Sequence, residues 1–449
     1  MDEWARSESL PTSQSLMTDS SSGPSQQRWF HAVTLDLSPL KSSREYRLLY
    51  FGQFVSAFGS AISYVVLPWQ MYQLTHSSFY VGLLGAAEFV PMFVLAFVGG
   101  TLADAFDRRR LVLTMELAMT VCCAVLVANA LRPQPSVAVL FAVAALFAAC
   151  NALHRPAHEA MTPRLVPPEH MAAVGALTMF RFSLTFIVGT SFAGLITSKL
   201  GASVGYTLDG LTFLASVLAL WRMQPVPPPE AAEQPSWEAV KQAWGYARSR
   251  QELLGTYLID INAMFFGMPM ALFPALAEQF GPDTVGLFYA TPAVGALLVT
   301  FFSGWAEKVE RHGLAVVLAA AVWGLAIVGF GLTTNLWLAL MFLLIAFAAD
   351  AVSGIFRMTI WNQTIPDYLR GRMASIEMIS YMSGPYLGNA EAGLVASLIG
   401  LRASVAVGGV LCVAGCVALG LCLPRFLRYT GSAGIAQKQA EEAARSQPD

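Results

Sequence analysis

The strongest constraint on this chain is the number of long apolar runs that it contains. A helix needs about 20 apolar residues to cross the hydrocarbon core of a bilayer, and the runs are continuous, unlike the alternating segments of a membrane β-barrel. Twelve stretches of the 449-residue sequence qualify, namely 46–74, 79–103, 111–131, 136–156, 170–196, 201–222, 252–280, 284–306, 313–333, 336–361, 370–398 and 401–426. We therefore predict an all-α membrane protein of twelve transmembrane helices.

The composition fits this class. Charged residues make up 12% of the chain, against roughly 25% in soluble domains. A formal net charge of -2 gives no reason to expect a nucleic acid partner. The six cysteines lie in apolar runs without metal-site spacing, so we expect neither a metal nor another cofactor. Residues 1–28 are rich in Ser and Gln and lack a signal-peptide core, so we expect a retained, mostly disordered tail over 1–45.

Positive charge predicts the orientation. Of the 27 Lys and Arg residues, only Arg132, Lys199 and Arg402 fall in the loops that follow odd-numbered helices, and Arg181 lies in mid-membrane. The remaining 23 lie in the tails and the other loops. Because cytoplasmic loops are enriched in Lys and Arg, we expect both termini in the cytoplasm and the protein in the bacterial inner membrane.

The middle of the chain reads as a linker. Residues 223–251 open with PVPPPEAAEQP, whose prolines prevent a helix, and continue as an amphipathic stretch that we expect to lie on the inner membrane surface. We therefore predict six-helix bundles over 46–222 and 252–426, a cytoplasmic tail over 427–449, and a monomer.

A short internal repeat supports this division. VGLL at 81–84 precedes GTLADAFDRRR at 100–110, and VGLF at 285–288 precedes SGWAEKVER at 303–311. Asp104 and Arg108 match Glu307 and Arg311 at a constant separation of 203 residues. Parallel repeats of this kind build one large class of secondary transporters.

The first of these loops resembles the signature between helices 2 and 3 of the major facilitator superfamily, and its Asp-Arg-Arg variant resembles the drug and siderophore exporter branch. The matching residues are Gly100, Leu102, Ala103, Asp104, Arg108 and Arg109. Further stretches resemble the enterobactin-exporting members of that branch, namely QMYQLTHSS at 70–78, FPALA at 273–277, VGLFYA at 285–290 and GRMASIEMI at 371–379. One departure is the stretch 189–194, which lacks the proline of the antiporter turn in helix 5.

The resemblance implies a conformational latch in these loops. Asp104 could accept from backbone amides at a helix N-terminus or pair with a basic residue, and so hold the cytoplasmic side closed. The expected latch residues are Gly100, Asp104, Arg108, Arg109, Glu307 and Arg311. The alternative is that the arginines only fix topology.

Charged residues within the spans are candidates for proton coupling, because a charge at the bilayer centre costs about 2.5–3.5 kcal/mol. The candidates are Glu88, Arg181, Asp260, Asp350 and Glu391. Arg181 and Asp350 lie at equal depth in the membrane, which predicts an ion pair between them. The pair could act in proton coupling or be permanently structural. Glu88 and Glu391 lie at similar depth on helices that face each other in this fold, and we expect them to be neighbours.

Three other acids are assigned structural or solvated roles. Asp209 lies on helix 6, which is peripheral in this fold, so we expect it to make a structural hydrogen bond. Glu116 and Glu377 are shallow enough to reach the inner interface.

A polar stripe on the first helix predicts a substrate cavity. Ser56, Ser60, Ser63 and Tyr64 recur at helical spacing, and such a stripe either lines a wet cavity or packs small residues against a neighbouring helix. The expected cavity residues are Gln53, Ser56, Ser60, Ser63, Tyr64, Asn151, Asn262 and Tyr381.

Taken together, the sequence predicts a secondary transporter. No GxxxxGK[ST] phosphate loop occurs, and no nucleophile constellation points to an enzyme. We expect a proton-coupled exporter, an antiporter, of an enterobactin-like siderophore or a hydrophobic drug. An uptake symporter and a non-transporting membrane sensor remain open alternatives.

Overall fold

The structure is a computed structural model that describes residues 35–227 and 237–446, with the side chains of 96–105, 237–240, 367, 371, 374, 375, 445 and 446 outside the description. Within these ranges the secondary structure is helical, and the bridge between Arg311 and Thr430 is isolated.

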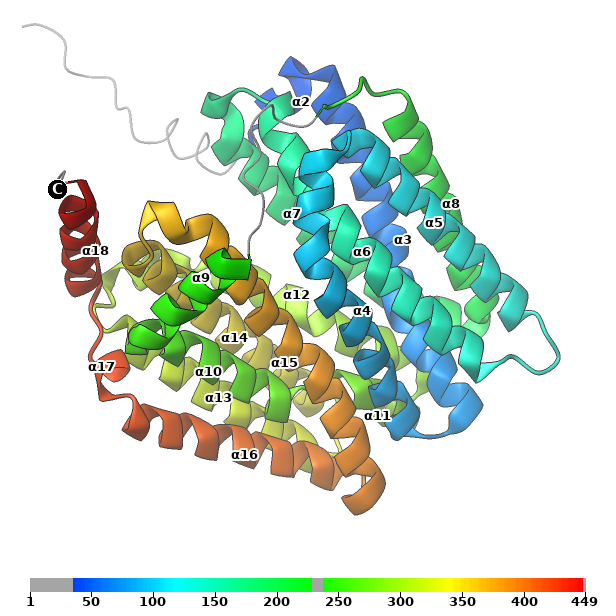
Figure 1. Ribbon diagram of the computed structural model, residues 1–449. Coiled ribbons are helices and arrows are strands. Elements are labelled where there is room, and N and C mark those ends of the chain that lie inside the picture. Colours follow the sequence, from blue (N-terminus) through cyan, green and yellow to red (C-terminus); the bar gives the residue numbers. More distant parts are fainter. Residues whose placement is uncertain (1–34, 228–236, 447–449) are drawn as a thin grey trace, which may run out of the picture. The chain divides into compact units, whose positions relative to one another are not determined.

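The long helices fall into two consecutive groups (Figure 1). The first group is α3 (Arg44–Thr75), α4 (Ser78–Ala105), α5 (Arg108–Ala130), α6 (Val137–Leu165), α7 (Met171–Lys199) and α8 (Ala202–Trp221). The second group is α10 (Gln251–Gly267), α11 (Phe273–Phe280), α12 (Val285–Phe301), α13 (His312–Leu332), α14 (Leu336–Thr364), α15 (Arg370–Ile399) and α16 (Leu401–Cys422). Outside them lie α2 (Ser38–Ser42), α9 (Trp237–Ser249), α17 (Pro424–Leu427) and α18 (Gly431–Ser446).

Eleven helices among the described residues are long and apolar enough to cross a membrane. The 30-residue helix α15 is not among them, and it contains Arg370, Arg372, Glu377 and Glu391. The helical class is confirmed, but a count of twelve spans is not.

The predicted helix over 252–280 is interrupted. α10 ends at Gly267, the 3-10 turn η2 covers Met270–Leu272, and α11 begins at Phe273. Pro269 has no amide hydrogen, and Met268 is extended with φ -89° and ψ 104°, so the ladder of hydrogen bonds cannot continue through this point.

Helices pack mainly within their own group. In the first, α3 contacts α7 and α8, α4 contacts α6, and α5 contacts α6 and α8. In the second, α13 contacts α14 and α16, α10 contacts α15 and α16, and α12 contacts α14. The two groups meet chiefly through α4 with α15 and through α7 with α12.

We call the side that carries α9 and α18 the linker side, and the side where α3 turns into α4 the far side. On the far side, glycines bring the two groups into backbone contact. A Cβ on Gly85 of α4 would lie 2.7 Å from the carbonyl oxygen of Tyr386 on α15. A Cβ on Gly194 of α7 would lie 2.9 Å from the amide nitrogen of Gly286 on α12. Small residues of this kind let membrane helices approach closely.

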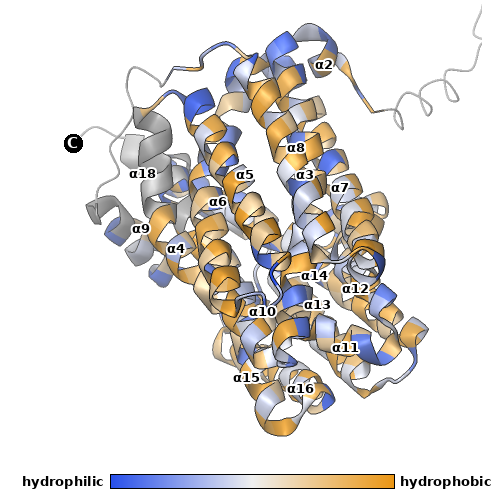
Figure 2. Ribbon diagram, turned by 90° about the vertical axis from the view of Figure 1, so that its right-hand side faces the viewer, coloured by the Kyte–Doolittle hydropathy of each residue, from blue (hydrophilic) through white to orange (hydrophobic). Residues whose placement is uncertain are grey.

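The outward faces of the helices are apolar, as Figure 2 shows for α5, α6 and α8. Large exposed hydrophobic side chains include Val121 on α5, Leu146 on α6 and Leu211 on α8. Exposed apolar surface of this extent suits contact with lipid.

Helix α9 docks on the second group instead of lying free on the membrane surface. Ala243 and Ala247 are fully buried in one cluster with Leu253 and Met373, whereas Trp244 is exposed. Docking against protein therefore covers the alanine face of this helix and leaves Trp244 outside the contact.

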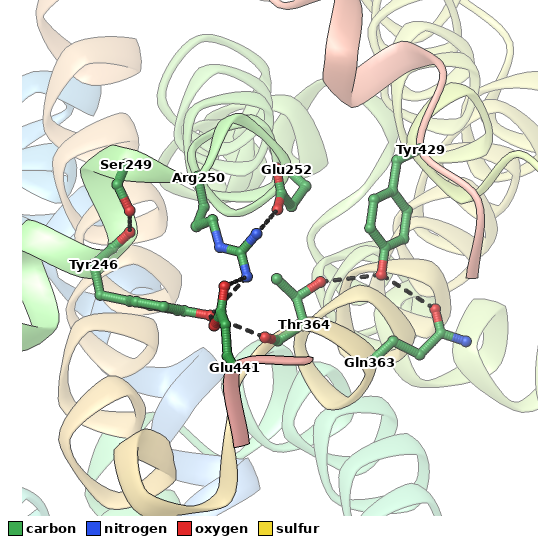
Figure 3. Close-up of polar contacts among 8 residues, drawn as sticks. All are labelled: Tyr246, Ser249, Arg250, Glu252, Gln363, Thr364, Tyr429 and Glu441. Atoms are coloured by element: carbon green, nitrogen blue, oxygen red, sulfur yellow. Dashed lines mark hydrogen bonds and ion pairs between the residues drawn. The ribbon is translucent and has the colours of Figure 1, made fainter. Parts of the chain in front are cut away.

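Helix α18 contacts α9 and the residue that follows it through polar side chains (Figure 3). Arg250 donates to Glu441 of α18 at 2.6 Å, and the Tyr246 hydroxyl lies 3.0 Å from Glu441 and 3.1 Å from the Thr364 carbonyl oxygen. Burial raises the pKa of Tyr246 to about 12. The tyrosine hydroxyl therefore stays a donor at physiological pH.

Candidate functional site

A cavity of about 350 Å³ lies between the first group and α15. Its lining residues are Ser60, Ser63, Tyr64, Leu67, Glu88, Met92, Leu126, Phe147, Ala148, Asn151, Ala152, Arg155, Pro156, Asp209, Met378, Met382 and Tyr386. Helices of both groups thus contribute to one site, as a transporter that moves its halves against each other requires.

The polar stripe of α3 contributes to this lining in part. Ser60, Ser63 and Tyr64 line the cavity, as does Asn151 of α6. Ser56 is buried, and Gln53 faces away from the cavity lining to donate to Glu116 of α5. The stripe therefore divides into an inner part that packs and an outer part that lines the cavity.

Three charged side chains line the cavity. Glu88 lines it and also an adjoining cavity of about 80 Å³. Asp209, expected to be peripheral, is fully buried from solvent and lines the same cavity, with its Oδ2 3.6 Å from Cys123 Sγ. Arg155 of α6, which the sequence analysis missed, donates to Glu159 at 2.8 Å. These charges make the cavity suitable for a polar or ionic ligand.

Arg155 was missed because the helix around it was predicted too short. The predicted span stopped at residue 156, whereas α6 continues through Pro156 and Pro163 to Leu165. Membrane helices tolerate such prolines when neighbouring groups satisfy the freed carbonyls. The extension moves Arg155 from the membrane surface to a position ten residues inside the helix end.

Aromatic and sulfur groups close the cavity on the far side. The Tyr64 hydroxyl donates to the Met270 sulfur at 3.1 Å, and its ring lies 5.6 Å from the Tyr289 ring. The Tyr289 hydroxyl donates to the Met270 carbonyl oxygen at 3.0 Å. Tyr64 comes from the first group and the other two residues from the second, so this contact must break before the cavity can open there.

The remaining lining is apolar and rich in methionine. Met92 of α4 faces Met378 and Met382 of α15. Methionine is flexible and polarizable, and it adapts to ligands of irregular shape.

A second charged cluster lies within the second group. Arg357 of α14 donates to Asp260 of α10 and lies 3.4 Å from Asp350 on its own helix. The expected pair between Arg181 and Asp350 is therefore wrong. Depth along a helix does not fix the direction of a side chain. The sequence analysis did not consider Arg357, which lies two turns from Asp350 within the predicted span 336–361.

The other candidates lie elsewhere. Arg181 of α7 lies within electrostatic reach of Tyr50 and His158. Glu391 lines neither of the two cavities that contain Glu88, because Asn389 and Tyr386 are the α15 residues that face this part of α4.

Two polar candidates differ in their surroundings. Asn262 donates to the Cys412 carbonyl oxygen at 2.9 Å and so joins α10 to α16. Tyr381 is 53% exposed and lies within electrostatic reach of both Arg155 and Arg357. A residue of α15 thus lies near an arginine of each group.

Glu116 departs most from expectation. Its side chain is fully buried, with Oε1 bonded to Gln53 and 3.3 Å from His154 Nε2. It does not reach the membrane interface, because it points into the first group between α3 and α6.

The expected latch lies partly outside the described residues, since these do not include the side chains of Gly100 and Asp104. Arg108 donates to the Ala160 carbonyl oxygen at 3.0 Å. Arg109 donates to the carbonyl oxygens of Leu220 and Trp221, both at 2.6 Å.

The matching loop of the second group lies on the same side. Glu307 lines a cavity beside α18, and Arg311 forms a backbone bridge with Thr430. No cluster of three or more metal-ligating side chains occurs in the part of the chain that the structure describes.

Known proteins match this chain over nearly its whole length. The family model described as "Transmembrane secretion effector" matches residues 34–439. The enterobactin exporter EntS of Salmonella typhi is 27% identical over 393 residues, which cover 87% of this chain and 94% of that protein. The enterobactin exporter EntS of Escherichia coli O1:K1 is 26% identical, over 84% of this chain and 91% of that protein.

Solved structures share the fold. A POT family transporter in complex with 5-aminolevulinic acid superposes with a TM-score of 0.68 at 11% identity, over 86% of this chain and 97% of that one. A bacterial homologue of the iron transporter ferroportin superposes with a TM-score of 0.64 at 15% identity, over 86% of this chain and 99% of that one. The protein is a multi-pass inner-membrane secondary transporter of small molecules with the major facilitator fold, not an enzyme. With its helical architecture and its cavity between two helix groups, it belongs to the transmembrane secretion effector family.

Proposed function

We propose that this protein exports an enterobactin-like siderophore by alternating access, driven by protons. It acts as a monomer in the inner membrane, with the linker side in the cytoplasm and no nucleic acid partner. The names of its relatives support the cargo, and the distribution of Lys and Arg supports the orientation.

The observation that carries the proposal is the arginine in the cavity lining. Arg155 lines the same cavity as Tyr64 and Tyr386, and Tyr381 lies within electrostatic reach of it. A guanidinium group forms charge-assisted hydrogen bonds with anionic oxygens and stacks on aromatic rings. A catecholate, which presents both, matches this lining.

The contacts between the groups support a cycle. The far side is held together by glycine contacts and by Tyr64 with Met270 and Tyr289, so cargo enters from the linker side. Release requires these contacts to break while the loops around Asp104 and Glu307 close the linker side. Glu88, a carboxylate in the cavity lining, is placed to exchange a proton as cargo enters or leaves.

A secretion assay tests the cargo and Arg155 together. The chain is expressed in enterobactin-producing cells whose own exporter is deleted, and enterobactin in the medium is quantified by chromatography. Loss of a charge-assisted hydrogen bond worth about 1.5–3 kcal/mol predicts roughly 10- to 100-fold lower secretion for Arg155→Ala at limiting cargo. Arg132→Ala, an exposed far-side loop residue, is the matched control. Equal secretion by both variants would refute the assignment.

A hydrophobic drug is a second candidate cargo. The methionine lining formed by Met92, Met378 and Met382 favours it, since such surfaces accept varied apolar ligands. A drug exporter should raise the resistance of sensitive cells, and Arg155→Ala should leave that resistance intact while Met382→Ala lowers it.

A further inference from the structure

The surroundings of Glu116 are unusual for a buried carboxylate. The side chain is fully shielded from solvent, and its Oε2 has no hydrogen-bond partner. Oε1 accepts from Gln53 Nε2 and lies 3.3 Å from His154 Nε2. Among the described residues, His154 is the ion-pair partner of Glu116. A buried carboxylate that lacks a permanent cation is costly when ionised, and the basic group beside Glu116 is an imidazole.

In the second group, a buried carboxylate has a permanent cation as its partner. α6 and α14 are both 29 residues long, and Arg357 lies seven residues before the end of α14, as His158 does before the end of α6. Arg357 binds Asp260 as a permanent cation. The first group has imidazoles here instead, and an imidazole gains and loses its proton near neutral pH.

A second imidazole lies next to His154 on the side nearer the linker side. The rings of His154 and His158 stack with centroids 5.8 Å apart and planes 8° apart, and His158 is the nearer of the two to the linker side. On α7, Arg181 lies within electrostatic reach of His158.

The other charged or titratable groups around Glu116 are few among the described residues. On α3, Tyr50 donates to the Leu177 carbonyl oxygen. On α6, Arg155 faces the cavity. On α8, Asp209 faces Cys123, two turns along α5 from Glu116.

We propose that Glu116 and His154 form a protonation site that takes up and releases one proton in each transport cycle, with His158 linking it to the linker side. The proton is shared as O–H on Glu116 or N–H on His154, and in the conformation described it leaves through His158 to water. This inference rests on the proposed function in one respect, that the exporter is proton-driven.

Infrared titration of the purified full-length protein in lipid nanodiscs tests the site without any cargo. A protonated carboxyl group gives a distinct C=O stretching band. The difference between wild type and Glu116→Gln should contain one such pH-dependent band, and Glu169→Gln, an exposed acid, should not remove it.

Variants of His154 separate a proton site from a structural contact. His154→Arg supplies a permanent cation, as in the second group, and should abolish the Glu116 band throughout the titration. His154→Gln keeps a hydrogen bond without a cation, and the band should persist to more alkaline pH than in wild type. A Glu116 band that is missing in wild type, or that neither histidine variant shifts, would overturn the proposal.

The secretion assay separates this inference from the proposed function. Enterobactin secretion without a titrating Glu116 band means that the site is wrong and the exporter right. A titrating band that shifts as described, without enterobactin secretion, means that the site stands and the cargo is wrong.

Discussion

An added methyl group at Gly194 should shift the conformational equilibrium of the transporter. A Cβ at this position of α7 would lie 2.9 Å from the Asp283 carbonyl oxygen and 2.9 Å from the Gly286 amide nitrogen. Ordinary contacts begin at 3.4 Å, so α7 and α12 must separate by about 0.5 Å, and backbone atoms cannot rotate away as a side chain would. Overpacking of this kind costs about 1–3 kcal/mol.

This cost applies only while the far side is closed. The population of that state relative to the opposite one should fall about 5- to 150-fold. Gly175→Ala is the matched control on the same helix, because its Cβ would meet no atom within 4 Å. Both variants gain the same helix propensity, about 1 kcal/mol, so the difference between them reports the contact.

Pulsed electron resonance measures the outcome. Nitroxide labels at Leu200 and Trp337, both exposed at the far side, report the separation of the two groups after exposed Cys422 is replaced by Ser. Gly194→Ala should add a longer distance that Gly175→Ala does not. Identical distance distributions in wild type and Gly194→Ala would refute the role of this contact in closing the far side.

Two further predictions concern buried polar contacts. Arg357→Gln leaves Asp260 without its cation and should lower stability by about 3–5 kcal/mol, and adding Asp260→Asn should restore part of the lost melting temperature; a double variant no more stable than Arg357→Gln would contradict the pairing. Tyr246→Phe removes the hydroxyl that contacts Glu441 and should speed hydrogen exchange in α18. Because the pKa of Tyr246 is raised to about 12, the stabilisation by its protonated hydroxyl is complete below the ordinary tyrosine value of about 10 and is lost only as pH rises through about 12. Hydrogen exchange in α18 of the wild type, corrected for its intrinsic pH dependence, should therefore show no loss of protection between about pH 7 and 9. A loss of protection in that range would contradict the role of the Tyr246 hydroxyl.

The helical class could be predicted from the sequence because hydrocarbon leaves a chain little choice. An apolar run of sufficient length must satisfy its own backbone hydrogen bonds, so α5, α8 and α13 lie close to the predicted spans. The failures lie at prolines. Pro156 does not end its helix, whereas the segment around Pro269 interrupts one, and the outcome depends on neighbours that a single sequence does not identify.

The candidate site was predicted less completely, for a geometric reason. Counting residues gives the depth of a side chain but not its direction around the helix axis. Glu88, Ser60 and Asn151 line the cavity, whereas Arg181 and Glu391 do not. Pairs such as Asp260 with Arg357 join helices far apart in sequence.

The interruption between α10 and α11 has an electrostatic consequence for the transport cycle. The Ala271 amide, which a continuous helix would satisfy internally, donates instead to Asn389 Oδ1 on α15 at 2.9 Å. Beside it, Met270 receives the Tyr64 hydroxyl. The Ala271 amide stays satisfied within the second group when the two groups part, whereas the Tyr64 hydroxyl loses its acceptor. Water or a cargo oxygen must then bind this hydroxyl, and that hydration adds to the free energy needed to open the far side.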